Sequence, residues 1–122
     1  MINLEVFEEK KLGIARCVDS LTAEDLQGYL GQWGRKGSEG YDELFVATNI
    51  DLQVNFSEML EHANVTVTYN RVVNATGRTA VVVDQEHAEQ VAGYYQAVHS
   101  IKGDREVQVF TDEAVAREWL GK

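Results

Sequence analysis

The 122-residue sequence contains no proline and only one cysteine, Cys17. A single cysteine excludes a disulfide within the chain and favours a reducing compartment. The longest apolar run, Ala80–Val83, is far too short to span a bilayer, and the first residues lack the basic and then apolar profile of a signal peptide. These features predict a soluble, cytoplasmic protein without a transmembrane segment.

Basic residues are also few: 11 Lys and Arg stand against 20 Asp and Glu, which gives a formal net charge of -9. Such a surface repels phosphate backbones, so nucleic acid is not an expected partner. The acidic surface also disfavours docking on anionic lipid, because the two basic pairs, Lys10-Lys11 and Arg35-Lys36, are too small for a polybasic patch. A peripheral membrane contact is left open. With 44% hydrophobic and 25% charged residues, we expect one globular domain, residues 1–122, with a core of its own.

The sequence shows no catalytic motif, phosphate-binding loop or metal-binding motif. Its histidines, His62, His87 and His99, are far apart, and no pair has the i, i+4 spacing of a zinc site on a helix. Cys17 lies on a predicted core strand, and the sequence has no second cysteine to act with it, which predicts a buried and inert thiol. We therefore expect no catalytic residue, no metal and no cofactor. A nucleophile and base assembled in space, such as Ser57 with His62, is the enzymatic alternative.

The first third of the chain predicts a hairpin followed by a helix. Residues 2–8 and 12–18 read as two strands joined by a charged turn. Thr22 and Asp25 have the spacing of a capping box, which marks a helix start. One apolar face follows at helical spacing: Leu26, Tyr29, Leu30 and Trp33. Glycines at every third position predict tight packing, local weakness or a close approach to a partner: Gly28, Gly31 and Gly34. Residues 35–40 look like a loop.

The remaining strands alternate with helices. The runs Leu44–Ala47, Thr79–Val83 and Val107–Phe110 read as short strands, and we expect them to be parallel neighbours. Asp84 precedes a helix with an apolar side over residues 88–98, and Thr111 is expected to cap the last helix. The order ββαβαβαβα predicts an α/β fold, a mainly parallel sheet with covering helices and right-handed crossovers.

Residues 64–76 fit two structures. Val65–Tyr69 alternate like a strand, because β-branched residues recur there. Ala63, Val67 and Asn70 instead continue a helical spacing from Met59, and a helix would stop at Gly77. We favour one long helix of low propensity, with the strand as the alternative.

Several of these runs resemble a known family. Gly77-Arg78-Thr79-Ala80-Val81-Val82-Val83, a helix with a central tyrosine, and the stretch from Val107 to Leu120 are similar to small bacterial SpoIIAA-like proteins. These form the STAS/SEC14 (CRAL-TRIO-like) domain family. The resemblance covers nearly the whole chain and implies a single STAS-like domain. Its motifs are structural, so it speaks for fold more than for activity.

The resemblance implies two functional themes. In the STAS theme, a serine or threonine at the start of the second helix is phosphorylated and switches a partner; here Ser57 would be the acceptor, with Asp51 nearby. This chain has one serine where the family motif has paired Ser/Thr, and no glycine follows. In the SEC14-like theme, an apolar ligand or lipid sits between the sheet and mobile helices.

A ligand groove is expected between residues 56–75, a poor intrinsic helix, and the helix over residues 88–98. Its lining would be Phe56, Met59, Leu60, Tyr94 and Tyr95, although these side chains equally suit the core. Tyr94 would alternatively border a dimer contact, which allows a homodimer. The sequence thus predicts a non-enzymatic domain that binds a protein partner or a small apolar, lipid-like ligand. A spatially assembled hydrolase-type site and a phosphoserine-switched regulatory domain are the alternatives.

Overall fold

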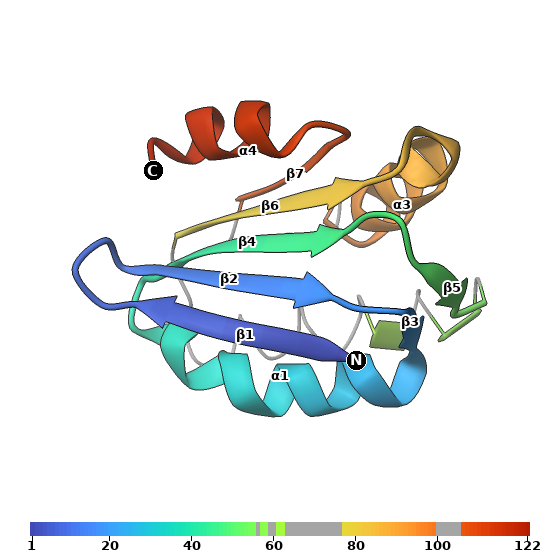
Figure 1. The fold of residues 1–122 in the computed structure, drawn as a ribbon, viewed down its shortest axis with the longest axis horizontal. Helices are drawn as coiled ribbons and strands as arrows, with labels where there is room; N and C mark the ends of the chain where they lie inside the picture. The colour runs from blue at the N-terminus through green and yellow to red at the C-terminus, as the bar shows by residue number, and fades with distance from the viewer. Residues whose placement is uncertain (56, 59–60, 63–76, 100–105) are drawn as a thin grey trace.

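A five-stranded sheet with helices on both faces organises the chain (Figure 1). The computed structural model describes residues 1–55, 57–58, 61–62, 77–99 and 106–122, with the backbone alone for residues 34–38 and 94–99. The sheet has the order β1-β2-β4-β6-β7. Its strands are β1 (Ile2–Phe7), β2 (Leu12–Cys17), β4 (Asp42–Ala47), β6 (Arg78–Val83) and β7 (Glu106–Phe110). A separate two-stranded ladder joins β3 (Ser20–Thr22) and β5 (Asp51–Gln53).

The predicted strand pairing is confirmed. β1 and β2 form an antiparallel hairpin, whereas β2, β4, β6 and β7 run parallel to one another. The fold is therefore α/β with a mostly parallel sheet. Among the described residues, the element order contains two short strands, β3 and β5, that the sequence pattern did not indicate. The helix expected between the strands at Leu44–Ala47 and Thr79–Val83 falls largely outside the described residues.

Alternating side chains of the strands fill two separate cores. On one face, α4 (Glu113–Leu120) packs Ala116 and Leu120 against the sheet. The sheet residues that meet them are Leu12, Ile14, Leu44, Val46, Ala80 and Val82. The opposite face carries α1 (Ala23–Ser38) and α3 (Gln85–His99), whose core residues include Leu26, Tyr29, Trp33 and Val91. Burial on both faces explains the continuous apolar run of β6.

The expected loop at residues 35–40 is wrong for its first four residues, because α1 continues to Ser38. The helix stops before Gly40, whose φ of 83° lies in the left-handed region that ends helices. Tight packing at Gly28 and Gly31 is also wrong, since nothing lies within 4 Å of a Cβ built at either. Local weakness of the helix and a close approach to a partner are the interpretations that remain for these glycines.

The last helix is capped one residue later than expected. Asp112, rather than Thr111, accepts hydrogen bonds from the N–H groups of Ala114 (2.8 Å) and Val115 (3.4 Å). Aspartate is a stronger N-cap than threonine, and its charge also suits the positive end of the helix.

Candidate functional site

The β3–β5 ladder lies at the carboxyl ends of the parallel strands, the edge where α/β domains most often bind ligands (Figure 1). Ser20 pairs with Asp51 and Thr22 with Gln53. β3 leads directly into α1, and β5 leads into the helical residues 57–58 and 61–62. Because the two strands are parallel and in register, the two helices begin close together. We call this arrangement the strand-end platform.

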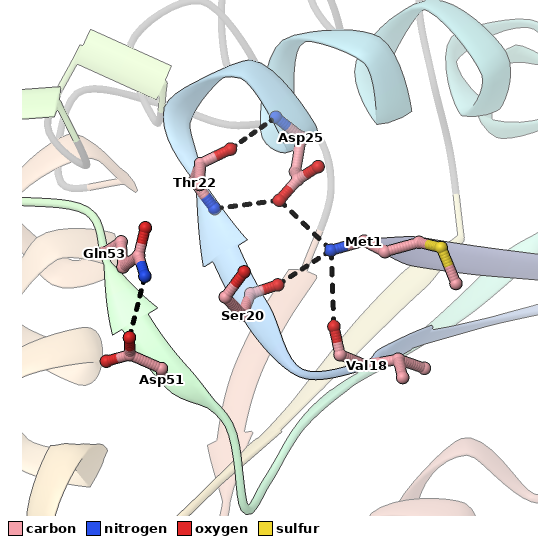
Figure 2. Close-up of polar contacts among 7 residues, drawn as sticks. All are labelled: Met1, Val18, Ser20, Thr22, Asp25, Asp51 and Gln53. Carbon is pink, nitrogen blue, oxygen red and sulfur yellow. Dashed lines mark hydrogen bonds and ion pairs between the residues drawn. The ribbon is translucent and has the colours of Figure 1, made fainter.

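The start of α1 is held by the predicted capping box (Figure 2). The Thr22 N–H donates to Asp25 Oδ2 at 3.0 Å, and the Asp25 N–H donates to Thr22 Oγ1 at 3.2 Å. The Met1 amino group donates to the same carboxylate at 3.2 Å and to the Ser20 carbonyl at 2.8 Å. The backbone hydrogen bond from Thr22 lowers the pKa of Asp25, and the Met1 amino group adds to that effect.

The second helix start carries a capping box of its own. The Asn55 N–H donates to Glu58 Oε1 at 3.1 Å, and the Glu58 N–H donates to Asn55 Oδ1 at 2.8 Å. Asn55 is therefore the N-cap, which places Ser57 at the second helical position, where its side chain is exposed. Asp51 is exposed as well and accepts a hydrogen bond from Gln53 Nε2 at 2.7 Å (Figure 2).

Hydrogen bonds hold the loops after β2 and β4 to neighbouring segments next to the strand-end platform. Asp19 and Asn49 have left-handed φ values of 66° and 55°, which these two residue types tolerate better than most. The Asp51 N–H donates to the Asp19 carbonyl at 2.9 Å, and the Asn49 N–H donates to Asp84 Oδ2 at 2.9 Å. The loops after β2 and β4 and the end of β6 are thereby fixed together. The signal in the sequence is an Asp or Asn soon after each of these strands, which the sequence analysis did not use.

The predicted ligand groove falls largely outside the described residues. Phe56, Met59 and Leu60 lie outside them, as does the choice between helix and strand for residues 64–76. Tyr94 and Tyr95 lie on α3, but their side chains are not among those described. One turn earlier, Val91 is buried together with Val81 and Val83 of β6. α3 therefore covers the sheet as expected, and the groove itself stays a prediction.

A buried carboxylate is the polar feature that sequence reasoning missed. The pair Asp42-Glu43 looks like solvated charge, yet Glu43 is only 8% exposed. Its Oε1 accepts from Thr79 Oγ1 at 2.9 Å, and its Oε2 accepts from the Tyr29 hydroxyl. Glu43 points to the α1 face because it lies two residues before Phe45 and four before Ala47, the residues of β4 that pack on that face. The hydroxyls of Tyr29 on α1 and Thr79 on β6 therefore satisfy both carboxyl oxygens of Glu43 within the core.

The remaining reactive side chains are shielded. Burial raises the pKa of the Cys17 thiol to about 12, which fits the predicted inert cysteine. Burial likewise lowers the pKa of His62. Within the described ranges, no cluster of three His, Cys, Asp or Glu side chains is placed to hold a metal ion. The helices described there are all too short or too polar to cross a membrane.

A scan against protein-family models gives no match, and a search of curated proteins gives none either.

Proposed function

We propose that this chain is a non-enzymatic binding domain of the STAS/SEC14-like kind, which takes a protein partner or a small apolar, lipid-like ligand. The observation that carries the proposal is that ionisable groups at the strand-end platform are hydrogen-bonded to the backbone or buried. The Asp25 carboxylate completes the capping box of α1, and the Asp84 carboxylate accepts a hydrogen bond from the Asn49 N–H. The Cys17 thiol is protonated at neutral pH, because burial raises its pKa to about 12. The two aspartates therefore use their hydrogen bonds to fix the backbone, as a scaffold for binding requires.

A rigid edge beside covering helices suits a site for an apolar chain. The platform fixes where α1 and the second helix begin, whereas strands cannot part without losing their ladder hydrogen bonds. Entry is therefore expected beside a covering helix, between α3 and the segment that holds Met59. Methionine and aromatic side chains adapt to ligands of irregular shape.

Native mass spectrometry of the purified chain, with a panel of fatty acids and phospholipids, tests this function. We expect a bound lipid-like mass and a raised melting temperature for the wild type. Met59→Trp should abolish both by filling the groove. Val115→Trp is the matched control, because Val115 is 49% exposed on α4, on the other face of the sheet. If no lipid binds and Met59→Trp behaves like the control, the lipid function is excluded and a protein partner is the remaining form of the proposal.

A phosphoserine switch is the second candidate, favoured by the exposure of Ser57 at the second helical position after Asn55. A phosphate there would meet the backbone N–H groups and the positive end of the helix dipole. Incubation of the chain with serine kinases, followed by mapping of the phosphosite, should label Ser57, and Ser57→Ala should remove the label. Labelling at another serine, or at none, would exclude this function and leave the binding function untouched.

A further inference from the structure

The outer edge of β1 offers backbone hydrogen bonds to another strand. β1 pairs with β2 on one side, and no strand of the described chain pairs with its other side (Figure 1). The Val18 N–H donates to the Met1 carbonyl at 2.8 Å, and the Met1 amino group donates to the Val18 carbonyl at 3.4 Å. Backbone groups alternate in direction along an antiparallel strand. Ile2, Leu4 and Val6 therefore direct their N–H and C=O groups outward.

We propose that this edge pairs with β1 of a second copy of the chain, antiparallel and about a two-fold axis at Leu4. The two five-stranded sheets then become one continuous sheet. Ile2 lies opposite Val6 of the second copy, and Leu4 lies opposite Leu4. All outward N–H and C=O groups of these residues are satisfied in this register. The interface does not depend on the ligand of the proposed function.

Charge selects this register over its neighbours. Moving the axis by one residue to Glu5 also satisfies outward groups, but it sets the two Glu5 carboxylates directly opposite each other, which is destabilising. Moving it to Asn3 shortens the overlap of the strands. With the axis at Leu4, Asn3 lies opposite Glu5 of the second copy, so an amide faces each carboxylate.

Exposed apolar side chains support the same register. Met1 and Phe7, at 56% and 39% exposure, are two of the three large hydrophobic residues that the described chain exposes. They point to the same face of β1 and lie opposite each other across the proposed two-fold axis. On the other face, Ile2, Leu4 and Val6 are half-buried beside Tyr29 and Trp33. In the dimer, the same three residues of the second copy would bury more of the surface that these side chains still expose. A two-fold contact of this kind closes on itself and does not propagate into fibres.

Sedimentation velocity of the full chain tests the interface. The wild type should sediment as a dimer at micromolar concentration. Leu4→Pro should be monomeric, because proline removes an outward N–H and leaves the β1–β2 hydrogen bonds in place. Asn3→Glu sets like charges opposite each other twice per dimer and should weaken dimerisation roughly tenfold. Gln108→Glu, which adds the same charge to the exposed side of β7 at the other edge of the sheet, is the control and should not change dimerisation.

Cross-linking tests the register. Asn3 and Glu5 of the second copy would form a non-hydrogen-bonded pair with Cα atoms about 4.5 Å apart, within disulfide range. The double variant Asn3→Cys, Glu5→Cys should therefore oxidise to a covalent dimer, and Glu5→Cys alone should not. A wild type that stays monomeric at millimolar concentration, or a dimer that Asn3→Glu leaves unchanged, would overturn the proposal. If circular dichroism shows that Leu4→Pro is unfolded, the effect of Asn3→Glu on dimerisation is the test of the interface.

Discussion

The indole of Trp33 lies directly against the backbone of Gly13. A Cβ built at Gly13 would be only 2.1 Å from the ring carbon Cζ3 of Trp33 and 2.6 Å from Cη2. Gly13 is on β2 and Trp33 is in the third turn of α1, so this contact sets how closely α1 approaches the sheet. In the same row across the sheet, Gly13 pairs with Glu43 and Glu43 pairs with Thr79. The missing side chain at Gly13 thus makes room for the Trp33 ring next to the strand position that holds the buried Glu43.

Gly13→Ala should destabilise the fold by about 1–3 kcal/mol, the usual cost of overpacking a filled core. Urea unfolding followed by Trp fluorescence measures the change. Gly31→Ala is the matched control, because it adds the same methyl group to an open position of α1. It should stabilise by about 0.5–1 kcal/mol through helix propensity. Equal effects of the two substitutions would show that Trp33 moves aside without cost.

Tyr29→Phe should destabilise by about 1.5–3 kcal/mol, because it removes a hydrogen bond to the buried Glu43 carboxylate. Tyr41→Phe is the comparison: its hydroxyl donates to Glu8 at 2.6 Å, but Glu8 is exposed and water can replace the donor. The expected loss there is under about 1 kcal/mol. Adding Glu43→Gln to each variant completes a double-mutant cycle, in which only the Tyr29 pair should show strong coupling. Equal losses would show that the burial of Glu43 does not strengthen its hydrogen bond with Tyr29.

The sheet was predictable from the sequence because its strands carry local signals. Val81–Val83 is β-branched and continuous, as burial on both faces demands, and the hairpin and the Thr22–Asp25 box are short-range patterns. Once these signals had located the strands, the order of the elements along the chain predicted which strands are parallel neighbours.

The strand-end platform was less predictable because its parts interact over long distances. Strands as short as Ser20–Thr22 have no periodicity to detect, and their pairing depends on the left-handed turn at Asp19. Glu43 looks solvated in its local sequence, and its burial is imposed by Tyr29 and Thr79, which are far away along the chain. Ser57 and Asp51 were expected near a helix start and lie there, but the cap is Asn55.

Acid should weaken the attachment of α4 to β2. Arg16 donates to both carboxylate oxygens of Glu113, at 2.7 and 3.0 Å. The hydrogen bonds from Arg16 lower the pKa of Glu113 below its ordinary value of 4.5. A lowered carboxylate pKa in the folded state gives stability at neutral pH that is lost as the pH falls below 4.5 toward the folded-state pKa.

Urea unfolding at neutral pH and at roughly pH 3 measures this contribution, which solvent screening limits to about 1 kcal/mol. Arg16→Gln and Glu113→Gln should each reduce the loss of stability on acidification. The double variant should differ little from either single variant, because both remove the same pair. An undiminished acid loss in all three variants would show that other carboxylates are responsible.

Cys17 should be unreactive in the folded chain. Its pKa is raised to about 12 by burial, so at roughly pH 8 the thiolate is far scarcer than for a free cysteine. Ellman's reagent should react with one thiol per chain in strong denaturant and only very slowly without it. Val115→Cys on a Cys17→Ala background is the control, since this position on α4 is exposed and should react at once. Rapid reaction of native Cys17 would mean that the core around it opens readily, and an enzymatic role for this thiol would then need to be tested.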